Sequence, residues 1–136
     1  KHFINVFGEE LMIENTDTAL AKTCQELKCQ VVDYTVAPIF MHDNEKGAHE
    51  WIVEFKDEPS HLENFKNLLD KNLQELNSDY EAKRHNNMTL NPLVLHKARK
   101  NLFYDWLKQQ DKLGGQHKVP RLSNQRNYLE SLLKLQ

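Results

Sequence analysis

The sequence has few of the residues that define several specialised classes of protein. Its 136 residues include only two cysteines, four glycines and four prolines, too few for a disulfide framework or a collagen-like repeat. Cys24 and Cys29 are five positions apart, which matches neither a zinc knuckle nor a redox C-x-x-C motif. We therefore expect reduced thiols and a cytoplasmic protein.

Long apolar runs and an excess of positive charge are also missing. The apolar stretches are far shorter than the about 20 residues that cross a membrane, so no membrane span is expected. A net charge of -2 and a pI near 6.4 argue against a general nucleic-acid surface, which needs many cations on one face. With 39% hydrophobic residues, the chain is predicted to form a single domain over residues 1–136.

Apolar patterns in the first half predict a strand, a helix and a hairpin. The run "HFINVFG" at 2–8 is typical of a strand, and Asn15 or Thr16 is the expected N-cap of the helix after it. Apolar and polar residues alternate at 32–36 and again at 51–56, on either side of the polar stretch "HDNEKG". These two segments are predicted to pair as a hairpin.

A longer apolar stripe predicts the next helix, in front of which Ser60 and Glu63 form a capping-box pattern. The stripe consists of Leu62, Phe65, Leu69, Leu73, Leu76 and Tyr80. "PLVLHKA" at 92–98 then indicates a strand, followed by a helix that ends near Gly114 and a last helix capped by Ser123. The predicted fold class is α+β: a ferredoxin-like βαββαβ unit whose small, mostly antiparallel sheet is covered by helices, with two additional C-terminal helices.

One segment, "LGGQHKVPRLSNQR" at 113–126, contains no acidic residue, although the chain has 20 acidic and 18 basic residues. Pro120 favours an extended Val119, which would direct Lys118 to the opposite side. A lysine ammonium suits phosphate oxygens whose charge moves during a reaction, whereas arginine suits a fixed bidentate contact. The residue types leave two interpretations open: phosphoryl or nucleotidyl chemistry, and a solvated loop that caps a helix.

Two motifs resemble a known enzyme family. "GQHKVPR" at 115–121 resembles the Gly-Gln-aromatic-Lys-Thr-Pro-Arg segment of the auxin-responsive acyl acid amido synthetases, and "LNSDYEAKR" at 76–84 is similar to their Leu-x-Ser-x-Tyr-x-x-x-Arg stretch. The spacing between the motifs also matches, and "INVFGEEL" at 4–11 resembles the segment after the hinge of adenylate-forming enzymes. His117 and Val119 depart from the plant motif, so the chain looks like a bacterial-type relative.

The resemblance implies that the chain is the C-terminal lid domain of a larger enzyme, and a first residue that is Lys1 rather than Met agrees with a fragment. Its partner would be a large N-terminal adenylation domain of the same chain, which would bind most of the ATP and Mg²⁺. The enzyme would activate a carboxylic acid as its acyl-adenylate and pass the acyl group to an amino acid. The lid domain by itself is expected to be inactive.

The resemblance also assigns candidate site residues. Lys118 matches the catalytic lysine of the superfamily, and Gln116, Lys118 and Arg121 are the candidate ATP-binding residues. For Arg121, a phosphate contact and a structural role in bracing the loop both stay open.

A possible domain-interface or acceptor site comprises Gly8, Glu9, Glu10, Tyr80 and Arg84. The residue pattern gives these positions simpler roles as well. Two acids after a strand are ordinarily exposed charge, Tyr80 continues the apolar stripe and is predicted in the core, and Arg84 is predicted at the surface or between domains. Core positions are also predicted for Trp51, Phe55 and Trp106.

The densest set of possible metal ligands falls in the predicted hairpin turn and consists of His42, Asp43, Glu45, His49 and Glu50. Its spacing matches no zinc pattern, so a solvated turn is favoured and no metal site is predicted. The alternative function is a stand-alone ferredoxin-like module that binds RNA or a small ligand. RNA binding would need exposed aromatic residues on the sheet and a basic surround, against which the acidic balance of the chain weighs.

Overall fold

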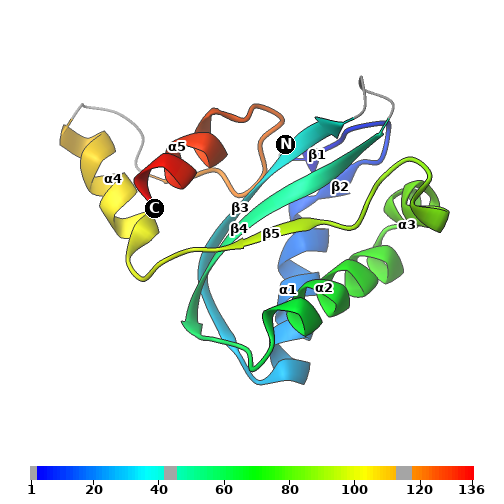
Figure 1. The fold of residues 1–136 in the computed structure, drawn as a ribbon, viewed down its shortest axis with the longest axis horizontal. Helices are drawn as coiled ribbons and strands as arrows, with labels where there is room; N and C mark the ends of the chain where they lie inside the picture. Colours follow the sequence, from blue (N-terminus) through cyan, green and yellow to red (C-terminus); the bar gives the residue numbers. More distant parts are fainter. Residues whose placement is uncertain (1–2, 42–45, 113–117) are drawn as a thin grey trace.

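The computed structural model describes residues 3–41, 46–112 and 118–136, and its central layer is a three-stranded sheet in the order β3-β4-β5 (Figure 1). β3 (Gln30–Met41) and β4 (Lys46–Asp57) form an antiparallel hairpin. β5 (Val94–Lys97) pairs in parallel with β4. The predicted α+β class, the hairpin and the strand after Pro92 are confirmed.

Helices cover both faces of this sheet (Figure 1). α1 (Ile13–Leu27) and α2 (Leu62–Leu76) pack against each other and onto one face, and α4 (Leu102–Lys112) and α5 (Asn127–Leu135) pack onto the other. Side chains alternate along a strand, so β4 contributes Trp51 to the first core and Ile52 to the second. β4 is consequently buried from residue 47 to residue 55.

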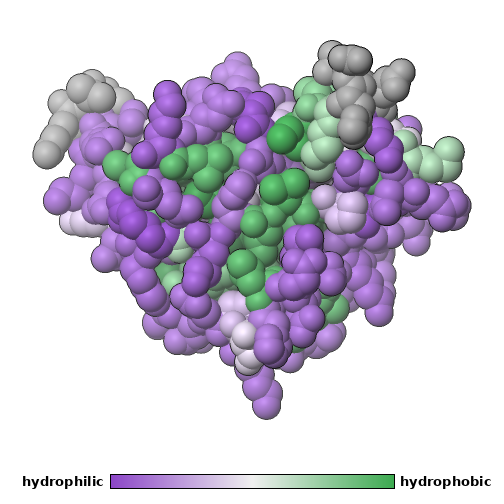
Figure 2. Space-filling model, viewed as in Figure 1, coloured by the Kyte–Doolittle hydropathy of each residue, from purple (hydrophilic) through white to green (hydrophobic). Residues whose placement is uncertain are grey.

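The face of the molecule drawn in Figure 2 is mainly hydrophilic. Figure 2 shows hydrophobic atoms between hydrophilic side chains over the middle of one face, where Figure 1 places the strands. In the part of the chain that the structure describes, no helix is both long enough and apolar enough to cross a membrane. Cys24 and Cys29 are free thiols, and burial raises the pKa of Cys24 to about 12.

The N-terminal strand differs from the prediction. β1 (Phe3–Ile4) and β2 (Leu11–Met12) form a separate two-stranded antiparallel sheet and do not join the main one. The predicted strand 2–8 ends early because the backbone N–H groups of Val6 and Phe7 donate to the carboxylate of Glu9. Those donors are then not available for a strand ladder.

Two predicted helix starts were wrong. α1 begins at Ile13 after the N-cap Met12, because Asn15 caps it from inside the first turn by accepting a hydrogen bond from the Met12 N–H (2.9 Å). α5 begins at Asn127 after Arg126 and not at Ser123. The Ser123 N–H donates instead to β3, which removes Ser123 from the helix end.

The long apolar stripe is divided between two helices. α2 begins after His61, one residue later than the capping-box pattern placed it, and ends at Leu76. Asn77 has an extended backbone (φ -143°), and its side chain accepts a hydrogen bond from the Tyr80 N–H (2.8 Å), which starts α3 (Ser78–Arg84). A short 3₁₀ turn, η1 (His85–Asn87), follows. The predicted helix end at Gly114 lies outside the described residues.

Candidate functional site

Lys118 begins a segment, residues 118–123, that runs along the outer edge of β3 and is called the Lys118 segment below. It lies in the part of the chain drawn in orange in Figure 1. Its backbone makes three hydrogen bonds with β3: Val36 N donates to Arg121 O (2.8 Å), Ser123 N donates to Val36 O (3.1 Å), and Thr35 Oγ1 donates to Pro120 O (2.7 Å). Val36 and Leu122 also form a parallel bridge. The Lys118 segment is therefore fixed to the sheet by its own backbone.

The side chains of the Lys118 segment point in opposite directions. Val119 is 6% exposed and belongs to the core under α4 and α5, and Leu122 is 2% exposed. Lys118 itself is exposed. The alternation predicted from Pro120 is confirmed, and among the described residues no carboxylate forms an ion pair with Lys118. The exposed Lys118 thus follows directly from a backbone that is anchored by its buried neighbour Val119.

Arg121 turns toward the body of the domain. Its guanidinium lies 3.4 Å from Asp17 Oδ1 on α1 and 3.6 Å from Asp33 Oδ1 on β3. It also lies over the ring of Tyr34, at 5.4 Å from the ring centre. Arg121 therefore has acceptors within the domain, and the two roles that the sequence left open for it, a phosphate contact and bracing of the loop, both stay predictions.

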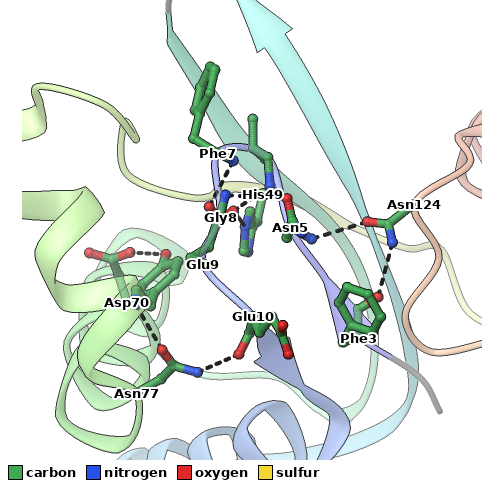
Figure 3. Close-up of polar contacts among 12 residues, drawn as sticks. Phe3, Asn5, Phe7, Gly8, Glu9, Glu10, His49, Asp70, Asn77 and Asn124 are labelled. Atoms are coloured by element: carbon green, nitrogen blue, oxygen red, sulfur yellow. Dashed lines mark hydrogen bonds and ion pairs between the residues drawn. The ribbon is translucent and has the colours of Figure 1, made fainter.

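The N-terminal loop turns at Gly8, whose φ of +102° is a conformation that side-chain-bearing residues rarely adopt. This turn places Glu9 in the interior, at 0% exposure. Its carboxylate accepts hydrogen bonds from the N–H groups of Val6 (2.6 Å) and Phe7 (2.9 Å), and it lies 2.7 Å from His49 Nε2 on β4 (Figure 3). The expectation that Glu9 is exposed charge was wrong.

The contacts of Glu9 set its ionisation. Burial alone raises the pKa of a carboxyl, but the hydrogen bonds from His49 and from the backbone of Phe7 and Val6 outweigh it, so that the pKa of Glu9 is lowered. Glu9 is therefore charged at neutral pH. Glu9 therefore connects the N-terminal loop at Val6 and Phe7 with His49 on β4, the central strand of the sheet.

Tyr80 and Arg84 meet at a single buried carboxylate, Asp70 of α2. The Tyr80 hydroxyl donates to Asp70 Oδ1 (2.6 Å), and Arg84 donates to both carboxylate oxygens, with its shortest contact at 2.6 Å. Burial raises the pKa of Tyr80 well above its ordinary value, so the phenol stays a donor. Tyr80 is 0% exposed, as predicted. The prediction of an Arg84 at the surface was wrong, because its side chain is only 9% exposed in this ion pair; the interdomain position stays a prediction.

The candidate residues form two groups. Lys118 and Arg121 lie in the segment beside β3. Glu9 and Tyr80 lie next to His49, whose ring centre is 5.3 Å from that of Tyr80, and Arg84 joins Tyr80 at Asp70. Glu10 is exposed, and its backbone carbonyl accepts a hydrogen bond from Asn77 (2.8 Å). Gln116 lies outside the described residues.

Asn124 connects the two groups, because it follows the Lys118 segment and bonds the backbone of the N-terminal strand. Its side chain accepts from the Asn5 N–H (3.1 Å) and donates to the Phe3 carbonyl (3.4 Å) (Figure 3).

The possible metal ligands lie differently from the prediction. His49 and Glu50 are buried on β4 and do not belong to a solvated turn; Glu50 lies 2.7 Å from His96 Nε2 and 2.8 Å from Arg126. His42, Asp43 and Glu45 lie outside the described residues. Within the described ranges, no three histidine, cysteine or acidic residues form a group that could hold a metal ion.

The acceptors that hold these groups were not among the residues predicted from the sequence. Asp17, Asp33 and Thr35 fix the Lys118 segment, and Asp70 joins Tyr80 to Arg84. Asp33 and Thr35 occupy polar positions in an alternating strand, where solvent exposure is the default expectation. The segment 113–126 contains basic residues and no acidic one, so an ion-pair partner of Arg121 had to come from another part of the chain. The sequence did not indicate that these partners are Asp17 and Asp33.

Residues 14–127 match the model of the GH3 family C-terminal domain. The chain belongs to this family. No curated protein matches the chain.

Two solved structures resemble this GH3 C-terminal domain, and both cover 98% of it. One is described as GH3.15 acyl acid amido synthetase, with a TM-score of 0.76 and 17% sequence identity. The other is described as AtGH3.15 acyl acid amido synthetase in complex with 2,4-DB, with a TM-score of 0.71 and 14% identity. The chain spans 25% of the length of each of these proteins.

The stand-alone RNA-binding module is not favoured by these findings. A sheet that binds RNA exposes aromatic residues on one face, but Tyr34, Trp51 and Phe55 are buried against α1 and α2. The opposite face is covered by α4 and α5. Among the described residues, both faces of the sheet are thus covered by helices of this GH3 C-terminal domain over these aromatic positions.

Proposed function

We propose that this GH3 C-terminal domain is the lid of an acyl acid amido synthetase that adenylates a carboxylic acid with ATP and transfers the acyl group to an amino acid. The observation that carries the proposal is the exposed Lys118 on a segment fixed to β3, within a chain that matches the GH3 family. The sequence resemblance assigns the catalytic lysine to this same position. The free thiols Cys24 and Cys29 suit a cytoplasmic enzyme.

The proposed reaction has two steps. In the first, a carboxylate oxygen attacks the α-phosphorus of ATP, the bond to the β-phosphate oxygen breaks, and pyrophosphate leaves. In the second, the amine of the amino acid attacks the acyl carbon, AMP leaves with the bonding electron pair, and the amine loses a proton to solvent. The products are the amide, AMP and pyrophosphate.

Lys118 is the group of this chain suited to the first step. Negative charge on the phosphate oxygens shifts during the displacement, and a nearby ammonium stabilises it without a further proton transfer. Lys118 is exposed, and on this proposal its ammonium bridges the acyl carboxylate and the α-phosphate. Mg²⁺ neutralises phosphate charge in such reactions and is assigned to the N-terminal domain.

The domain is proposed to act by closing over a site in a larger partner domain. Solved structures that share its fold are about four times its length, since the chain covers 25% of each. A lysine delivered by a closing lid completes the site at the moment of reaction and excludes water. On this proposal the isolated domain is inactive because it lacks the pockets for the acid and for ATP.

The reaction class is tested on the full-length gene product with ATP, a panel of carboxylic acids and a mixture of amino acids. Mass spectrometry should detect an amide, with one AMP formed for each amide. Formation of ADP in place of AMP would contradict an acyl-adenylate route. An amide formed without consumption of ATP would contradict the proposal as a whole.

A further inference from the structure

The guanidinium of Arg121 is already occupied within the domain. It lies between Asp17 on α1 and Asp33 on β3, at 3.4 and 3.6 Å, and over the ring of Tyr34. Arg121 is thus a single cation shared by two carboxylates. These contacts use Nη1 and Nε of the guanidinium.

The acceptors of Arg121 are themselves held in place. The Tyr34 hydroxyl donates to Asp17, and the Tyr34 N–H donates to Asp33 Oδ1 (2.8 Å). Tyr34 is 3% exposed and stacks on Trp51, with ring centres 5.2 Å apart. A row of contacts therefore runs from the core of the domain to a residue three positions from Lys118.

We propose that Arg121 is a positioning residue for Lys118, and that Asp17 and Asp33 are the acceptors through which it acts. Arg121, Asp17 and Asp33 form a clamp, which holds the Lys118 segment through the Arg121 side chain. The hydrogen bonds to β3 hold the same segment through its backbone. This inference rests on the proposed function, because it concerns how Lys118 is aimed at the phosphate.

The clamp should affect catalysis and folding stability by very different amounts. The side chains of Arg121 and Asp17 are each 44% exposed, and ion pairs at such exposed sites contribute about 0 to 1 kcal/mol to folding stability. A misplacement of about 1 Å at a catalytic group can lower the rate by about 100-fold. Loss of the clamp should therefore reduce turnover much more than it reduces the stability of the fold.

The test uses acid-dependent exchange of pyrophosphate into ATP by the full-length gene product. Arg121→Gln and the double variant Asp17→Asn/Asp33→Asn should each lower kcat by about tenfold, with the KM for ATP within about twofold of wild type. Because both remove the same clamp, the triple variant should lose no more than either. Arg121→Lys, which keeps the charge without the planar fork, should recover part of the loss.

A matched control is Arg99→Gln, which breaks an exposed pair with Asp105 (3.0 Å) on another part of the surface. It should exchange pyrophosphate at the wild-type rate. The clamp is contradicted if Arg121→Gln raises the KM for ATP by about tenfold or more while the two aspartate variants behave as wild type, which is the pattern of direct phosphate binding. Multiplying losses in the triple variant would contradict it as well.

Hydrogen exchange provides a readout that is independent of catalysis. The Ser123 N–H, which donates to Val36 on β3, should exchange up to about fivefold faster in Arg121→Gln and in the double aspartate variant, because the segment opens locally more often. It should be unchanged in Arg99→Gln. Unchanged exchange in all variants would overturn the clamp. A wild-type protein with no pyrophosphate exchange would contradict the proposed function, and amide exchange would still decide the inference.

Discussion

Glu9 and Glu10 are adjacent and chemically identical, yet their environments are opposite. Glu9 is 0% exposed and accepts hydrogen bonds from two backbone amides, whereas Glu10 is exposed. The side-chain partner of Glu9 is His49, which is 40 positions away in the sequence. A local pattern of residues contains no record of such a partner, which is why the sequence predicted exposed charge at both positions.

Replacement of Glu9 by glutamine should destabilise the domain by about 2 kcal/mol, because hydrogen bonds to a buried charged group contribute about 1.5 to 3 kcal/mol. Urea denaturation at pH 7 measures the loss. The matched control is Glu10→Gln, which should change the free energy of unfolding by less than about 0.5 kcal/mol. Equal effects of the two substitutions would contradict the assigned environment of Glu9.

The pH dependence of the same comparison has a definite sign. The pKa of Glu9 in the folded protein is below its ordinary value of 4.5, so the unfolded chain binds the proton more tightly. The contribution of Glu9 is therefore complete above pH 4.5 and is lost as the pH falls through the folded pKa. The difference between wild type and Glu9→Gln should narrow over this range, and a difference that widens would contradict the assignment.

Arg84 offers a contrast between a buried and an exposed ion pair. Arg84→Ala leaves Asp70 buried and without its bidentate partner, so we expect a loss of about 3 kcal/mol or more of unfolding free energy. Lys97→Ala breaks the ion pair between Lys97 and Glu58, in which the two side chains are 44% and 51% exposed. This substitution should change the free energy of unfolding by less than about 1 kcal/mol. Thermal unfolding compares the two variants. A loss for Arg84→Ala no larger than that for Lys97→Ala would show that the Asp70 pair is not structural.

At the scale of elements, periodic segments could be predicted and short ones could not. β3, β4 and α2 have repeated apolar positions that only one secondary structure satisfies. β1 and β2 contain two residues each, too few to establish a period. The break at Asn77 was also missed, because Leu76 and Tyr80 keep the helical spacing across it and the cap depends on one side chain.

Gly47 lies where β4 packs against Val6 of the N-terminal loop. A Cβ at this position would lie 2.6 Å from Val6 Cγ1 and 2.7 Å from the backbone oxygen of Ile39. The strand partner cannot move without breaking the hairpin, so Gly47→Ala should cost about 1 to 3 kcal/mol by overpacking. The adjacent Ala48→Gly is a control for backbone flexibility near the same turn. Urea denaturation of Gly47→Ala with an unchanged midpoint would contradict this packing.

At the scale of the whole molecule, the fold builds a fixed support for one exposed lysine. The two cores bury both faces of β4, and the Lys118 segment extends the sheet beyond β3. The orientation of Lys118 could be predicted, because Pro120 and a buried Val119 determine it locally. The acceptors Asp17 and Asp33 could not, since α1 and β3 approach the segment only in the folded chain.

The assignment of Lys118 as the catalytic lysine is tested most directly by acid-dependent pyrophosphate exchange into ATP, comparing the full-length wild type with Lys118→Ala. Loss of one transition-state contact of this kind costs about 3 to 4 kcal/mol, so exchange should fall by about two to three orders of magnitude. Thermal unfolding should be unchanged, and Lys134→Ala, an exposed lysine on α5, should exchange at the wild-type rate. Exchange by Lys118→Ala at close to the wild-type rate would contradict the assignment of this lysine to catalysis.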